Sequence, residues 1–245
     1  MKCKRFLSIS ILGVFLLIGF VYYTTVFIFI EDWVGLQSSA GSLNVIIFTF
    51  LVSLCFFSFF VCVLTDPGHV PDSYVPDIEE SGVPDEERRK NDHHCIWINN
   101  CVGYWNYKAF FTLVLYATIG SIYSTVMIVA CSIQKDWEFS ERVSFKIFYV
   151  TSGVMMVALS LTLGTLLGWH IYLIIHNMTT IEYYEGVRAA WLARKSGQSY
   201  RHPFDHGVYK NITLVLGPNM LKWLCPTALS HLKDGLNFPT SRDRL

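Results

Sequence analysis

"LNVIIFTFLVSLCFFSFFVCVLT", residues 43–65, contains no Asp, Glu, Lys or Arg and is mostly apolar. An α-helix needs roughly 20 such residues to cross a hydrocarbon layer ~30 Å thick, and this run is long enough. Three further runs share its length and its lack of charge: residues 6–30, 110–133 and 147–175. Core helices of soluble proteins rarely stay uncharged for so long, and only 16% of all residues are charged, against about 25% in soluble domains. We therefore predict an all-α polytopic membrane protein with four transmembrane helices.

The distribution of basic residues predicts the orientation of these helices. Of the 19 lysines and arginines, 3 lie between the third and fourth runs and none lies between the first and second. The other 16 lie on the opposite side, and positive residues favour the cytosol. We expect both termini and the loop between the second and third runs to be cytosolic. The first run follows three basic residues, as in a signal peptide, but its length and the lack of a small-residue cleavage site predict an uncleaved helix.

This topology divides the chain into four parts. The first two helices lie in residues 1–65, a cytosolic loop in 66–109, the last two helices in 110–175, and a cytosolic tail in 176–245. Residues 66–91 are rich in Pro, Asp, Glu and Ser and are expected to form an extended linker.

The tail begins with a helix signal. Thr179 and Glu182 have capping-box spacing, which predicts a helix over residues 181–195. One face of this helix would be apolar, with Ile181, Tyr184, Val187 and Trp191. Basic residues elsewhere on the same helix make it typical of a segment that lies at the membrane interface.

The loop carries Asp92, His93, His94 and Cys95 in sequence, with Cys101 a few residues further on. A structural zinc site generally needs four Cys or His ligands. His94 and Cys101 could supply two, and His69 is the remaining histidine upstream in the loop, so a complete zinc set cannot be assembled locally. A structural disulfide is also not expected in the cytosol.

Nucleophilic catalysis is the other chemistry that these residue types suggest. A cysteine attacks as its thiolate, and a neighbouring imidazole can accept its proton. In an extended strand His93 and Cys95 share one face, and His94 faces away. Asp92 could orient the imidazole of His93, although this needs a local turn. The alternative is a solvated loop with two chance histidines, and the residues alone leave it open.

The pattern resembles the DHHC family of protein S-acyltransferases, or palmitoyltransferases. The resemblance extends over most of the chain and rests on motifs in the same order: Asp66-Pro67-Gly68; Asp92 to Cys95 followed by Cys101, Gly103, Asn106 and Phe110; Thr179-Thr180-Ile181-Glu182; and Asn211, Gly217 and Trp223 to Pro226. It implies that Cys95 takes a fatty acyl group from acyl-CoA as a thioester and passes it to a cysteine of a substrate protein. It further implies that His93 is the base, that Asp92 orients it, and that His94 and Cys101 are zinc ligands.

One departure from the family pattern bears on activity. The family carries Cys-x-x-Cys pairs and a further His-Cys before the Asp-His-His-Cys motif, and this chain has none of them. We therefore expect little zinc, no contact that fixes residues 92–101 at the membrane face, and impaired acyl transfer. A non-enzymatic membrane scaffold or substrate-binding variant is the alternative. A metal transporter is disfavoured because no apolar run carries a charge, and His170 is expected to be interfacial.

The partners follow from the same reading. We expect membrane-associated substrate proteins with cytosolic cysteines, in the Golgi, the endoplasmic reticulum or the plasma membrane. The formal net charge of zero argues against a nucleic acid partner.

Overall fold

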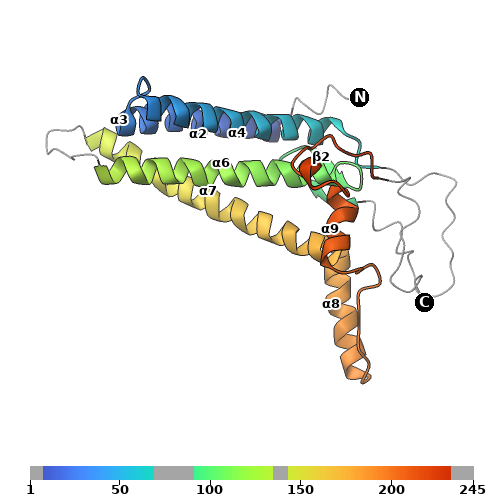
Figure 1. The fold of residues 1–245 in the computed structure, drawn as a ribbon. Helices are drawn as coiled ribbons and strands as arrows, with labels where there is room; N and C mark the ends of the chain where they lie inside the picture. Colours follow the sequence, from blue (N-terminus) through green and yellow to red (C-terminus); the bar gives the residue numbers. More distant parts are fainter. Residues whose placement is uncertain (1–7, 69–90, 135–142, 233–245) are drawn as a thin grey trace. The chain divides into compact units, whose positions relative to one another are not determined.

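The computed structural model of the protein describes residues 8–68, 91–134 and 143–232. Four helical segments in it are long and apolar enough to cross a membrane: Ile9–Val34, Ser39–Leu64, Tyr107–Gln134 and Val143–His176. The predicted all-α polytopic architecture with four transmembrane helices is confirmed (Figure 1). Most of the predicted linker and His69 lie outside the described residues.

The first membrane segment continues beyond the C-terminal end of its apolar run. It consists of α2 (Ile9–Thr24), the π-helix η1 (Thr25–Ile30) and α3 (Glu31–Val34). The Thr25 hydroxyl donates to the carbonyl of Val21 at 2.6 Å, which satisfies a backbone group where the helix widens. The helix therefore continues past residue 30, where the sequence predicted a loop, and ends at Gly35, whose φ of 76° suits a glycine.

The remaining membrane helices are α4 (Ser39–Leu64), α6 (Tyr107–Gln134) and α7 (Val143–His176). Each begins a few residues before its apolar run, so that Lys108 and Lys146 become helical. A helix satisfies its own backbone hydrogen bonds, which favours its continuation through the polar edges of a membrane.

The chain forms two compact units. One joins residues 59–68, 91–112 and 169–232, and the other joins residues 8–58, 113–134 and 143–168. The second unit has an apolar core built from Val21, Val26, Phe29, Ile30, Phe48, Met127, Ile128, Cys131, Tyr149 and Met156. Two pairs of polar side chains inside it are hydrogen-bonded to each other, which lowers the cost of burying them: Thr25 with Ser124 at 2.6 Å, and Thr125 with Ser160 at 2.9 Å.

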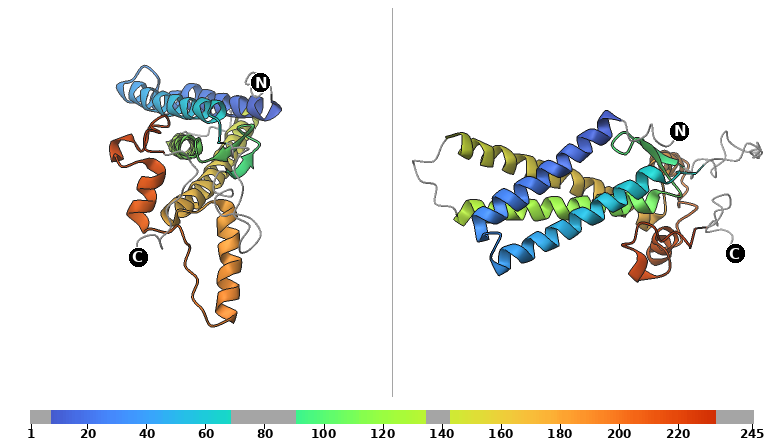
Figure 2. Two further views of the ribbon diagram at one scale, coloured as in Figure 1. Left: turned by 90° about the vertical axis from the view of Figure 1, so that its right-hand side faces the viewer. Right: turned by 90° about the horizontal axis from the view of Figure 1, so that it is seen from above.

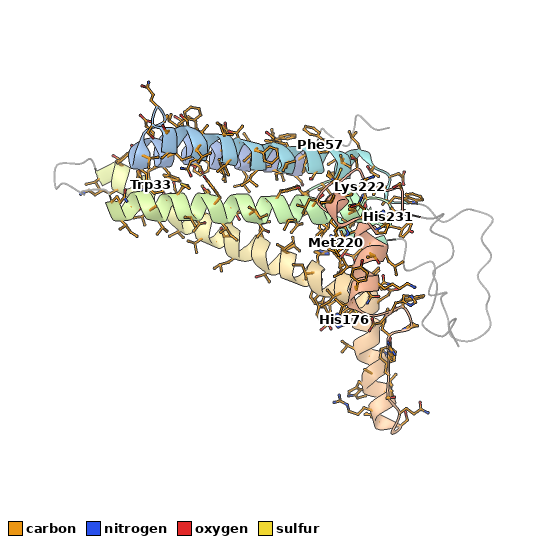
Figure 3. All side chains as sticks on the ribbon, in the orientation of Figure 1. Trp33, Phe57, His176, Met220, Lys222 and His231 are labelled. Carbon is orange, nitrogen blue, oxygen red and sulfur yellow. The ribbon has the colours of Figure 1, made fainter. Side chains whose placement is uncertain are left out.

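The first unit contains one end each of three membrane helices, the hairpin and the described part of the tail. A two-stranded antiparallel sheet, β1 (Asn91–Cys95) with β2 (Asn100–Gly103), precedes α6. The tail supplies α8 (Thr180–Lys195), α9 (Val208–Leu216) and the short 3₁₀ turn η2 (Met220–Lys222). Met220, Lys222 and His231, labelled in Figure 3, lie in the last described part of this tail.

A sharp turn separates α7 from α8. Asn177 adopts a φ of 50°, and the amide of Met178 donates to the carbonyl of Leu173 at 3.0 Å, which closes the end of α7. Figure 2 shows α8 turning away from the end of α7.

The predicted tail helix is confirmed at almost the predicted bounds. Both bonds of the capping box form: the Glu182 amide donates to the Thr179 hydroxyl at 3.2 Å, and the Thr179 amide donates to the Glu182 carboxylate at 2.7 Å. All four predicted apolar residues of this helix are exposed, and the contact of this face with the membrane interface stays a prediction.

Candidate functional site

The strand β1 brings the reactive residue types together. Within the hairpin His93 lies opposite Val102, His94 opposite Cys101 and Cys95 opposite Asn100, and the register shifts between Asn91 and His93. Asp92 therefore has no cross-strand partner and forms a β-bulge. The bulge is the local turn that the sequence reasoning required, because it places the Asp92 carboxylate 2.5 Å from His93 Nδ1.

Asp92 is buried and held by the start of α8. The backbone amide of Thr180 donates to Asp92 Oδ1 at 2.5 Å, and the Thr180 hydroxyl donates to Oδ2 at 3.1 Å. The first amides of a helix have no partner within it and favour a negative charge. Burial works against a charged Asp92, but its hydrogen bonds with His93 and Thr180 prevail and lower the pKa of the carboxyl group.

His93 and Cys95 form the reactive pair. Burial disfavours a charged His93, but hydrogen bonds with Asp92 and Cys95 outweigh it and raise the pKa of the imidazole to about 9. Burial also raises the pKa of the Cys95 thiol, yet hydrogen bonds from His93 and from the amides of Ile98 and Trp97 lower it overall. The two shifts favour an imidazolium beside a thiolate, which is the nucleophilic form of a cysteine.

Two residues that the sequence reasoning did not assign enclose His93. The ring of Phe110 lies 5.4 Å from that of His93, and the ring of His170 lies 6.0 Å from it, measured between centroids. His170 was expected to be interfacial, but only 1% of it is exposed, and its Nδ1 lies 3.0 Å from the Tyr107 hydroxyl. The end of α7 packs against the hairpin and buries His170, which the sequence did not predict, and its depth relative to the membrane interface stays a prediction.

His94 and Cys101 lie together on the hairpin, on the side away from His93. His94 Nδ1 and Cys101 Sγ are 3.5 Å apart. Zinc bonds of ~2.3 Å to sulfur and ~2.0 Å to nitrogen at a tetrahedral angle give about the same separation. Among the described residues, however, no group of three or more His, Cys, Asp or Glu side chains could hold a metal. The pair could supply half of a tetrahedral set, and no other residue of the described segments completes it.

A cavity of about 480 Å³ adjoins Asp92. Its walls come from the start of α6, the end of α7, α8, α9 and the residues that follow α9. Lys108 lines it and is buried, and its ammonium group donates to the carbonyls of Leu216 at 2.7 Å and Ala228 at 3.1 Å. These bonds attach the tail to α6 beside the hairpin.

The fold and site together define a class of protein: an integral membrane enzyme whose candidate nucleophile is a cysteine. Comparison with known sequences identifies the family. The sequence model of the DHHC palmitoyltransferase family matches residues 88–187. A protein of Arabidopsis thaliana named probable protein S-acyltransferase 15 is 57% identical, with 92% of this chain and 99% of the relative aligned. Probable protein S-acyltransferase 16 of the same organism is 44% identical, with 97% and 94% aligned. The chain belongs to the DHHC family of protein S-acyltransferases and is an acyltransferase.

The two alignments also bear on the departure from the family pattern. They extend over 252 and 271 positions, whereas this chain has 245 residues. Both relatives therefore carry residues that have no counterpart here. A more distant relative, zebrafish palmitoyltransferase ZDHHC15A, is 34% identical over 62% of this chain and 44% of its own length.

Proposed function

We propose that the chain transfers a fatty acyl group, palmitoyl or a similar chain, from acyl-CoA to cysteines of membrane-associated proteins through a thioester on Cys95. The observation that carries the proposal is the position of His93, which bonds to Asp92 on one side and to Cys95 on the other. That arrangement is the base, its orienting carboxylate and the nucleophile of a catalytic triad.

In the first half-reaction His93 takes the proton of the Cys95 thiol. The thiolate attacks the carbonyl carbon of acyl-CoA, a carbon–sulfur bond forms to Cys95, and the bond to the CoA sulfur breaks. The leaving CoA thiolate takes the proton from His93. In the second half-reaction His93 takes the proton of the substrate cysteine, whose thiolate attacks the acyl carbon and releases Cys95 as a thiolate, which the imidazolium reprotonates.

Asp92 acts through His93. Its Oδ2 lies against Nδ1, so the proton on that nitrogen stays in place and Nε2 is left to exchange a proton with sulfur. The two bonds from Thr180 hold the carboxylate still while the imidazole gains and loses charge.

A site at the end of a membrane helix suits a fatty acyl donor. Burial of an acyl chain contributes about 0.8 kcal/mol per methylene, so the donor is held in the bilayer with its thioester near the surface. Loss of the segment before Asp92 is expected to impair turnover, but the intact set of Asp92, His93 and Cys95 favours an enzyme over a scaffold.

The test of the proposal is acyl-CoA labelling of the purified chain. Wild type should acquire a hydroxylamine-sensitive acyl label, and Cys95→Ser should abolish it. Cys101→Ser is the matched control, since Cys101 lies on the other strand, and should keep the label. A label that persists in Cys95→Ser would overturn the assignment of the nucleophile.

We further propose that the site faces the cytosol of an endomembrane, the Golgi or the endoplasmic reticulum, or of the plasma membrane. The bias of lysine and arginine supports this orientation. Glycosylation tags placed after residue 245 and near Leu36 test it. The tag near Leu36 should be modified and the C-terminal tag should not, and the reverse pattern would overturn the orientation.

A further inference from the structure

The C-terminal end of α4 leaves backbone carbonyls that need partners. The last four carbonyls of an α-helix have no acceptor role within the helix, and a buried carbonyl without a donor costs about 1–3 kcal/mol. The amide of Thr65 bonds to Val61 at 2.9 Å. The carbonyls of Cys62, Val63 and Thr65 receive their hydrogen bonds from the hairpin instead.

Asn100 on β2 supplies those bonds. Its side-chain nitrogen lies 3.2 Å from the carbonyl oxygen of Cys62, 3.4 Å from that of Val63 and 3.1 Å from that of Thr65. Its side-chain oxygen accepts from the backbone amide of Cys101 at 3.0 Å. Asn100 is only 4% exposed, so it is buried with its N–H donors directed to carbonyls at the end of α4 and its oxygen bonded to its own strand.

Asn106 reinforces the same junction from the start of α6. Its side chain is fully buried, donates to the carbonyl of Cys101 at 2.8 Å and accepts from the amide of Gly103 at 2.8 Å. The Trp105 amide donates to the carbonyl of Pro67 at 3.3 Å just beyond α4. The residues that follow β2 are thus also attached to the segment after α4, and Asn106 ties them to β2.

The register places this attachment directly across from Cys95. Asn100 and Cys95 are cross-strand partners, and the Cβ atoms of such partners are about 4.5–5.5 Å apart. Asn100 is bonded to the end of α4 and pairs with Cys95 across the hairpin. Asn100 therefore fixes the position of Cys95 relative to the end of that membrane helix. The expectation that nothing fixes residues 92–101 at the membrane face is therefore wrong.

We propose that Asn100, supported by Asn106, is a positioning residue that holds Cys95 at the end of α4, where a membrane-embedded acyl thioester is presented. This inference rests on the proposed function of Cys95 as acyl carrier. The hydrogen bonds of the Asn100 side chain go to backbone groups of the α4 end and of β2, so we assign it a geometric contribution. A misplacement of about 1 Å can cost about 10²-fold in rate.

The decisive variant is Asn100→Asp in the full chain. It keeps the size of the side chain, loses both N–H donors and sets a carboxylate against three carbonyls. The matched control is Asn99→Asp, the same chemical change one residue earlier, in the turn of the hairpin, where Asn and Asp both tolerate its φ of 47°. Asn100→Gln keeps the donors on a longer side chain and should restore part of the loss.

Two measurements on these variants separate placement from chemistry and from unfolding. The first is loading of Cys95 from palmitoyl-CoA, which should fall about 10²-fold in Asn100→Asp and stay near wild type in Asn99→Asp. The second is the rate at which a charged methanethiosulfonate reagent modifies Cys95. That rate should rise several-fold in Asn100→Asp as the hairpin leaves α4, while Cys62 and Cys131 stay protected.

The outcomes distinguish this inference from the proposed function. If wild type acquires no acyl label on Cys95, the proposed function fails, and the accessibility of Cys95 still decides the role of Asn100. Equal accessibility of Cys95 in Asn100→Asp and Asn99→Asp overturns the inference. Exposure of Cys62 and Cys131 together with Cys95 also overturns it, because Asn100 would then support the fold as a whole.

Discussion

The two strands of the hairpin carry different parts of the same task. Strand β1 holds Asp92, His93 and Cys95 and is attached to α8 through Thr180. Strand β2 holds no candidate reacting group and is attached to α4 through Asn100. Reactivity and placement are therefore separable in this site, because each strand has its own attachment within the first unit.

The largest effect on the loading of Cys95 is expected from a substitution in β1. His93→Ala removes the base and should slow loading of Cys95 from acyl-CoA by about 10²–10⁴-fold, measured as the initial rate of label incorporation. His94→Ala is the matched change on the opposite side of the same strand and should cost much less. Equal losses of loading rate in the two variants would show that removal of either histidine disrupts the structure of β1, and would contradict a specific role of His93 as the base.

The next largest effect, on zinc content and acyl transfer, is expected from a segment inserted before β1. Insertion of a segment with two Cys-x-x-Cys units and a His-Cys before Asp92 should complete the half set formed by His94 and Cys101. Zinc content should rise from well under one equivalent to about two, and acyl transfer by up to about 10²-fold. The same insert with serine for each cysteine is the control. A native chain that already binds stoichiometric zinc and transfers at the repaired rate contradicts this prediction.

A smaller effect is expected where β1 meets α8. Thr180→Val removes the hydroxyl bond to Asp92 but keeps the backbone bond, and a hydrogen bond to a charged group contributes about 1.5–3 kcal/mol. Loading should fall roughly tenfold, and Thr180→Ser should recover most of it. Thr179→Ala, one residue earlier, removes the helix cap and should instead lower the free energy of unfolding by about 1 kcal/mol with little change in loading.

The pH dependence of Cys95 gives the smallest and most specific effect. Burial raises the pKa of the Cys95 thiol, but its hydrogen bonds with His93 and with the amides of Ile98 and Trp97 together outweigh burial, so the pKa lies below the usual 9.0. The rate of alkylation by iodoacetamide should therefore rise with pH at a midpoint below 9.0. His93→Ala removes the hydrogen bond that contributes most to lowering the Cys95 pKa, while burial still raises it. The midpoint of alkylation should therefore move to higher pH. An unmoved midpoint would mean that His93 does not stabilise the thiolate.

Local features of the sequence were enough to predict much of the architecture. Four uncharged runs predicted the four membrane helices, since a lipid interior selects for apolar length alone. The capping pair Thr179 and Glu182 predicted α8, because the bonds involved lie within one helical turn. The alternation of side chains along a strand also predicted that His93 and Cys95 would act together, and the resemblance to the DHHC family directed attention to them.

The way in which that site is held depends on tertiary contacts. Nothing in the spacing of the residues showed that Thr180 would bind Asp92, that His170 would be buried beside His93, or that Asn100 would cap α4. These contacts join residues far apart in the chain, and each depends on where two helices end relative to the hairpin. The chemistry that the chain can carry was predictable from the sequence, because it depends on residue types at short range. The position of that chemistry at the end of the membrane helices depends on long-range hydrogen bonds, which no local pattern encodes.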